Sequence, residues 1–87
     1  VINKDTNILD IGSNCGFISL SLAEHANHVL GVEKSEELIN ISNTAKRILN
    51  RSNCDFKKAK FANFFTDDKF DLILSLAIHH WVEMPFS

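Results

Sequence analysis

The chain has 87 residues, which is enough for one small domain. Hydrophobic residues make up 45% of it and charged residues 23%, so disorder, collagen and coiled coil are excluded as descriptions of the whole chain. The formal net charge of −2 argues against binding nucleic acid through a polybasic surface. A membrane-spanning helix needs about 20 consecutive apolar residues, and no stretch of this sequence comes near that length.

The first residue is Val1 and not Met, so we expect the chain to be a fragment or a processed form. No secretory signal is visible in the sequence. Its two cysteines, Cys15 and Cys54, are expected to be free thiols in a reducing compartment. A disulfide between them is the less favoured alternative. We therefore expect a cytoplasmic protein that contacts no membrane.

Four short apolar segments predict strands, at residues 8–11, 28–32, 54–61 and 70–76. Between the first three lie two predicted helices, one at residues 17–25 and a longer one that Ser35 caps. The longer helix should bury one apolar stripe, formed by Leu38, Ile41, Ala45, Ile48 and Leu49. This alternation predicts an α/β fold of three layers, with a parallel sheet and helices on both of its faces.

The loop after the first strand has the composition of a ligand-binding turn. Asp10 lies near the end of the buried strand, and Gly12 and Gly16 follow before the first helix. Gly12 can adopt the positive φ that a sharp turn needs, and Gly16 leaves room for a ligand or for close packing of the helix on the strand. A carboxylate among apolar neighbours needs a partner, because an unpaired buried charge is costly. A plain strand–helix turn is the alternative interpretation.

A second acidic residue, Glu33, ends the next strand, 23 residues after Asp10 in the sequence. In nucleotide-binding α/β sheets, an acid at the tip of the strand next to the glycine loop binds the two hydroxyls of a ribose. The spacing therefore favours a nucleoside-containing ligand over a plain turn.

These segments resemble three motifs of the class I S-adenosylmethionine-dependent methyltransferases. Residues 9–16 show the first motif, an acid between apolar residues followed by Gly-x-x-x-Gly, and Glu33 matches the acid of the second strand. Residues 70–73, Phe-Asp-Leu-Ile, match the opening of the family's fourth strand. The resemblance covers about residues 7–82. It implies a Rossmann-like fold with the sheet order 3-2-1-4, in which residues 1–87 are the N-terminal, cofactor-binding part of an incomplete domain without the acceptor-side strands.

The resemblance implies a site for S-adenosylmethionine, or for its product S-adenosylhomocysteine, on ten residues. They are Asp10, Gly12, Ser13, Asn14, Gly16, Glu33, Lys34, Ala62, Asn63 and Ser75. The glycine loop would meet the amino-acid tail, with Asp10 near its ammonium group, and Glu33 would accept hydrogen bonds from the ribose hydroxyls. Asn63, after Ala62, would stand in for the acid that meets the adenine. Ser75 either binds the cofactor or satisfies the end of the fourth strand.

Two histidines after the fourth strand, His79 and His80, are the candidates for a catalytic base, because histidine titrates near neutral pH. The alternative is that one packs against Trp81 and the other is solvated. No metal site is expected, since His25 and His28 lack the paired short spacings that zinc ligands show.

Two other functions stay open from the sequence. An NAD(P)-binding oxidoreductase would need Gly-x-Gly-x-x-Gly, and the second glycine of that pattern is missing after Gly12. A non-catalytic methyltransferase-like binding module is the other alternative. For an enzyme, the composition favours a small-molecule acceptor over nucleic acid. The fourth strand, apolar and without a charge after Asp71, is expected to lie at an open sheet edge and to permit self-association.

Overall fold

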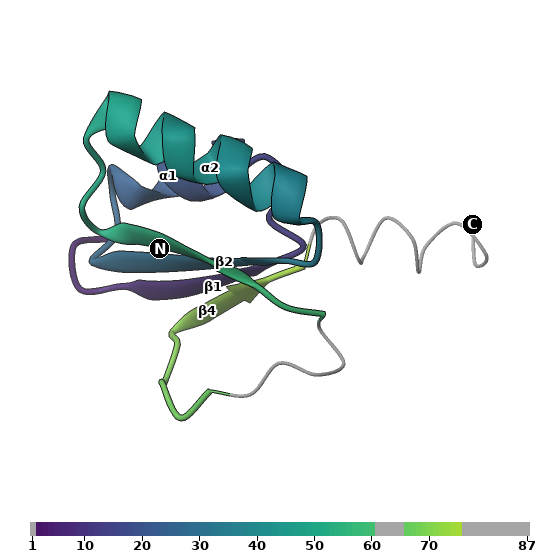
Figure 1. The fold of residues 1–87 in the computed structure, drawn as a ribbon. Coiled ribbons are helices and arrows are strands. Elements are labelled where there is room, and N and C mark those ends of the chain that lie inside the picture. The colour runs from purple at the N-terminus through teal and green to yellow at the C-terminus, as the bar shows by residue number, and fades with distance from the viewer. Residues whose placement is uncertain (1, 61–65, 76–87) are drawn as a thin grey trace, which may run out of the picture.

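The computed structural model describes residues 2–60 and 66–75. It contains β1 (Asn7–Ile11), α1 (Phe17–Ala23), β2 (His28–Glu33), α2 (Glu36–Leu49), β3 (Cys54–Lys58) and β4 (Leu72–Leu74). The four strands form one parallel sheet in the order β3-β2-β1-β4, which confirms the predicted topology (Figure 1). The third and fourth strands are shorter than predicted, and the first helix ends at Ala23 rather than His25.

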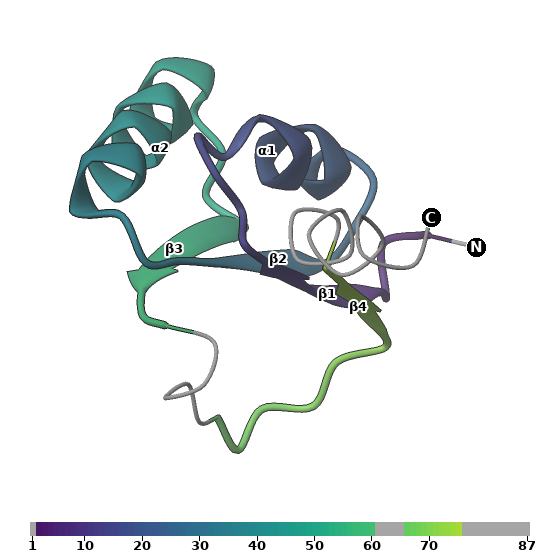
Figure 2. The same ribbon diagram turned by 90° about the vertical axis from the view of Figure 1, so that its right-hand side faces the viewer.

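Both helices cover the same face of the sheet (Figures 1 and 2). We predicted helices on both faces, and the described residues show one helical layer. The two crossovers β1-α1-β2 and β2-α2-β3 step across the sheet in the same direction, and right-handed crossovers then place both helices on one side. The connection to β4 crosses the sheet in the opposite direction, and its described part, residues 66–70, lies on the other side (Figure 2).

The sheet buries side chains on both faces, as a parallel sheet of apolar strands should. Under the helices lies one cluster of buried residues: Ile8, Leu20, Ala23, Ala26, Val29 and Cys54. On the opposite face lies a second cluster, formed by Leu9, Ile11 and Val32, against which Leu30, Ala59 and Phe70 pack. Successive residues of β1 and β2 alternate between the two clusters because side chains of a strand point to opposite faces in turn.

The buried face of α2 differs from the predicted stripe. Ile39 and Ser42 are buried, whereas Ile41 and Ile48 are 46% and 78% exposed. The Ser42 hydroxyl bonds Leu38 O at 2.8 Å and Asn14 O at 3.3 Å, so this small polar residue allows α2 to lie close to the loop after β1. Packing against that loop, rather than the apolar periodicity of the helix, therefore sets which side of α2 is buried.

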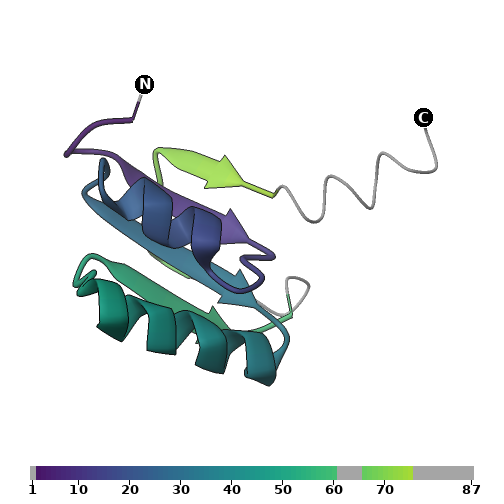
Figure 3. The same ribbon diagram turned by 90° about the horizontal axis from the view of Figure 1, so that it is seen from above.

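The ends of α2 follow the sequence rules. The Ser35 hydroxyl accepts a hydrogen bond from Leu38 N at 3.3 Å, and acidic residues occupy the first turn and basic residues the last. Asn50 closes the helix in the left-handed conformation. Seen from above, α1 and α2 lie side by side over the strands (Figure 3), and neither of them has the length and apolar character that crossing a membrane requires.

Candidate functional site

The loop between β1 and α1 makes three left-handed backbone steps, at Gly12 (φ 72°), Asn14 (φ 58°) and Gly16 (φ 84°). The N–H groups of Gly12 and Ser13 donate to Val32 O at 2.8 and 3.0 Å. The chain therefore turns at the carboxyl end of β1 and lies against the carboxyl end of β2. Positive φ favours glycine, with asparagine the best tolerated substitute, so the sequence Gly-x-Asn-x-Gly suits this path.

Close packing beneath the loop explains two glycines. A Cβ on Gly16 would lie 2.7 Å from both the Phe56 ring and the Ser42 hydroxyl oxygen. A Cβ on Gly31 would lie 2.7 Å from the same ring and 2.9 Å from Ser13 Cβ. Gly16 thus fulfils the packing half of its predicted role. Sequence reasoning missed Gly31, although a glycine inside a buried strand beside a glycine loop is itself a signal of close approach.

Glu33 connects the loop to α2. Its carboxylate is buried and accepts hydrogen bonds from Asn14 N and Ser35 N, both at 2.9 Å. A carboxylate offers about four lone-pair positions, so two of them remain for further donors. The predicted binding of a vicinal diol at Glu33 stays a prediction that this geometry permits.

Asp10 lies under α1 and is 4% exposed. The hydroxyl of Ser19 donates to its Oδ2 at 2.6 Å. Burial raises the pKa of Asp10, and the Ser19 hydrogen bond offsets part of that rise. Within residues 2–60 and 66–75, no Lys, Arg or His forms an ion pair with it. As far as the described residues go, the carboxylate is therefore a buried acid without a counter-ion, the state in which a cationic ligand group would be favoured.

The other predicted site residues have different surroundings. Ser13 is 5% exposed, and its hydroxyl has no hydrogen-bond partner in the described part of the chain. Lys34 is exposed, and Ser75 is half-buried directly after β4, at the edge of the sheet where β1 also ends. Four predicted positions, Ala62, Asn63, His79 and His80, lie outside the described residues.

The two cysteines differ in position and in exposure. Cys15 is an exposed free thiol in the loop, and Cys54 is a buried one under the helices. Burial raises the pKa of Cys54 to about 12. Among the described residues, no group of three His, Cys, Asp or Glu side chains is arranged to hold a metal ion.

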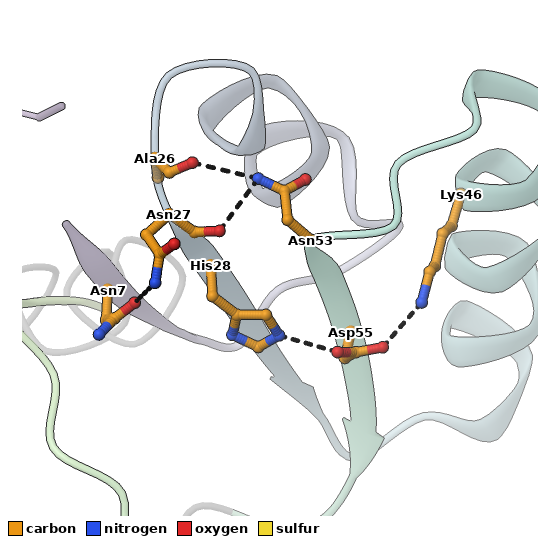
Figure 4. A network of polar contacts seen from close by, with 7 residues as sticks. All are labelled: Asn7, Ala26, Asn27, His28, Lys46, Asn53 and Asp55. Carbon is orange, nitrogen blue, oxygen red and sulfur yellow. Dashed lines mark hydrogen bonds and ion pairs between the residues drawn. The ribbon is translucent and has the colours of Figure 1, made fainter. Parts of the chain in front are cut away.

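A second polar cluster lies at the opposite end of the sheet (Figure 4). His28 Nε2 is 2.8 Å from Asp55 Oδ2, and Lys46 Nζ donates to Asp55 Oδ1 at 2.7 Å. The Asn53 side chain donates to Ala26 O in the same region. His28 and Asp55 stand near the amino ends of β2 and β3, far along the strands from the loop that follows Ile11. This cluster therefore holds α2 and the strands together without belonging to the candidate site.

The cluster predicts an acid-dependent contribution to stability. Hydrogen bonds from His28 and then Lys46 lower the pKa of Asp55. A lowered pKa stabilises the folded protein above about pH 4, where the unfolded aspartate is ionised, and this contribution is lost as pH falls through the folded value. Because the side chain is half exposed, we expect Asp55→Asn to cost less than about 1 kcal/mol at pH 7 and less at pH 2 than at pH 7.

Urea unfolding at the two pH values measures this difference, with the exposed Asp5→Asn variant as control. An Asp55→Asn deficit that is equal at pH 7 and pH 2 would contradict the assignment of the effect to the ionised carboxylate.

Comparison with known proteins identifies the family. The family profile described as "Methyltransferase domain" matches residues 2–85. The chain belongs to this family. The ribosomal protein L11 methyltransferase of Lactobacillus johnsonii is 30% identical to this methyltransferase domain over 73 residues, which are 83% of the chain and 23% of that protein.

Solved structures share the fold. The YcgJ protein of Bacillus subtilis superposes with a TM-score of 0.79 at 23% identity, over 85% of this chain and 32% of that one. PKMT2 of Rickettsia typhi, solved in complex with AdoHcy, gives a TM-score of 0.75 at 25% identity, over 83% of this chain and 15% of that one. The methyltransferase domain described here thus spans less than a third of the length of each of these relatives.

Proposed function

We propose that this methyltransferase domain binds S-adenosylmethionine and that the protein transfers its methyl group to an acceptor. The main observation behind this proposal is at the edge of the sheet where the strands have their carboxyl ends. Two buried carboxylates, those of Asp10 and Glu33, lie there on either side of the glycine loop. Asp10 lies near the end of β1, just before that loop, and Glu33 accepts a hydrogen bond from Asn14 N in the middle of it. Membership of the family supports the proposal, as does the AdoHcy found in the structure of the Rickettsia typhi relative.

The residues present fit the cofactor. Glu33 keeps two lone-pair positions for the ribose hydroxyls after its bonds to Asn14 N and Ser35 N. Asp10 has no protein counter-ion in the described residues and suits the ammonium of the amino-acid tail. When bound, the sulfonium cofactor supplies an activated methyl group together with its own leaving group. The protein's work is therefore to bind, orient and exclude water.

An NAD(P) site fits less well. A dinucleotide needs close approach of the backbone to its pyrophosphate at the second glycine of its motif, and Asn14 stands there in a left-handed conformation. Its backbone N–H is already bonded to Glu33. The loop thus offers neither the missing glycine nor a free amide at this position.

A calorimetric titration with S-adenosylhomocysteine, NAD and adenosine tests the proposal. We expect S-adenosylhomocysteine to bind and NAD not to bind, with adenosine weaker than S-adenosylhomocysteine because it lacks the amino-acid tail. Glu37→Gln, an exposed glutamate on α2, is the matched control for changes at Glu33. Binding of NAD in preference to S-adenosylhomocysteine would overturn the proposal in favour of the oxidoreductase.

For the acceptor we propose a small molecule, with His79 or His80 as the base if the acceptor must lose a proton. The support is the net charge of −2, because a chain without an excess of positive charge is less suited to bind nucleic acid. We also propose a cytoplasmic location, on the support of two free thiols.

We further propose self-association through β4. In the described structure this strand pairs with β1 alone and stands at the edge of the sheet, with Ile73 58% exposed. An apolar edge without a charge presents unpaired backbone groups to a second copy. Ile73→Lys should raise the monomer fraction in sedimentation, whereas Ile48→Lys, an exposed isoleucine on α2, should not. An equal effect of both variants, or a wild-type monomer at every concentration, would refute this contact.

A further inference from the structure

The surroundings of Asp10 are unusually poor in charge. Its own strand β1, the helix α1 above it and the neighbouring strand β4 contain no other ionisable side chain. The carboxylate is 4% exposed and has one hydrogen-bond donor in the described structure, the hydroxyl of Ser19. Burial in such a site favours the protonated form of the carboxyl group, and a nearby cation favours the ionised form.

Ser19 is fully buried in the middle of α1 and bonds Asp10 Oδ2 at 2.6 Å. The contact restrains the rotation of the carboxylate, because the donor is held by a helix that packs on β2 and β3. Ser19 uses one lone-pair position of Oδ2, and Oδ1 accepts no hydrogen bond from the described residues, so Oδ1 is the more open oxygen for a ligand. The serine therefore determines how the acid is presented, although it has no predicted contact with the cofactor.

We propose that Ser19 is a positioning residue of the cofactor site, which orients Asp10 as the counter-ion of the ligand's ammonium, and that binding of this ammonium releases a proton from Asp10. The inference rests on the proposed function. At pH values where the free acid carries a proton, the O–H bond breaks when the ammonium arrives, the electron pair stays on the carboxylate, and the proton leaves to solvent.

The ionisable groups on the other elements around Asp10 do not supply a positive charge to its carboxylate. Cys54 on β3 is buried under the same helices, and its pKa of about 12 keeps it a neutral thiol. At the two ends of β2, Glu33 is bonded to backbone N–H groups and His28 is paired with Asp55. On α2, Lys46 is also paired with Asp55.

The sign of the linkage follows from the raised pKa of Asp10 in the free protein. A neighbouring ammonium lowers that pKa, so protons are released at pH values between the lowered and the raised value. Within this window binding displaces the proton, so affinity falls as pH falls. Below the window the acid stays protonated in both the free and the bound protein, and affinity no longer changes with pH. A ligand without the ammonium should bind with no such dependence.

Calorimetry in two buffers of different ionisation enthalpy counts the protons released. We expect release with S-adenosylhomocysteine and none with adenosine, which has the same nucleoside without the amino-acid tail. Asp10→Asn should abolish the release. Ser19→Ala should lower S-adenosylhomocysteine affinity about tenfold at neutral pH and extend the release to higher pH, because the hydrogen bond that favours the ionised acid is gone.

Ser21→Ala is the matched control, since Ser21 is an exposed serine on the same helix. Equal behaviour of the Ser19→Ala and Ser21→Ala variants would overturn the positioning role. Binding of S-adenosylhomocysteine to the wild type without proton release would overturn the linkage and leave the proposed function intact. If S-adenosylhomocysteine does not bind at all, both fail. The wild-type comparison with adenosine and Asp10→Asn decides the linkage even if Ser19→Ala does not fold.

Discussion

Gly16→Ala is expected to destabilise the fold by about 2–5 kcal/mol. The residue has φ 84°, where alanine costs about 1–2 kcal/mol more than glycine. The new Cβ would also lie 2.7 Å from the Phe56 ring and the Ser42 hydroxyl, and crowding of this kind in a packed interior adds about 1–3 kcal/mol. Small domains have only about 5–15 kcal/mol in total, so urea midpoints should fall steeply.

The two causes can be separated within the same chain. Asn50 has φ 55° at the exposed end of α2, so the difference between Asn50→Gly and Asn50→Ala measures alanine at positive φ without crowding. Adding Phe56→Leu to Gly16→Ala should recover part of the crowding cost and none of the backbone cost. If Gly16→Ala costs no more than the Asn50 difference, the close packing of loop, α2 and β3 does not contribute to stability.

The elements and their order were predictable because each has a local signal. Apolar runs indicated the strands, Ser35 with the acidic residues behind it indicated the start of α2, and two glycines indicated the loop. The topology 3-2-1-4 came with the family resemblance. The single helical layer follows from the direction of two crossovers, which the predicted order already contained.

The buried face of α2 could not be predicted from its periodicity. Ile41 and Ile48 repeat at helical spacing as well as Ile39 does, and the exposed pair makes the more regular stripe. The deciding contact is between Ser42 and Asn14 O, two residues 28 positions apart. A contact of that kind depends on how the loop after β1 folds, which no local pattern encodes.

The candidate site was predictable in its positions and not in its partners. Asp10 and Glu33 come from strand ends, and parallel strands bring their carboxyl ends to one edge. That Ser19 holds Asp10, and that Glu33 binds the loop and α2 before any ligand, are tertiary hydrogen bonds seen only in the structure. Glu33 therefore has two roles, one in the fold and one proposed in binding.

Glu33→Ala should show both roles at once. The Asn14 and Ser35 amides lose their acceptor, and a buried unpaired donor costs about 1–3 kcal/mol, so stability should fall by about 2–4 kcal/mol. If the carboxylate also accepts both ribose hydroxyls, S-adenosylhomocysteine affinity should fall by about 3 kcal/mol, which is roughly a hundredfold. Glu37→Gln, on the exposed side of α2, should change neither quantity.

A ligand comparison separates binding from folding. Wild-type protein should bind adenosine more tightly than 2′-deoxyadenosine, because one donor to Glu33 is missing from the second ligand. In Glu33→Ala this preference should disappear whatever the stability of the variant, since both ligands meet the same weakened fold. Glu33→Gln, which keeps one carbonyl oxygen, should retain part of the preference. A variant without the carboxylate that still discriminates the two nucleosides as wild type does would remove Glu33 from the ribose site and leave it as the residue that joins the glycine loop to α2.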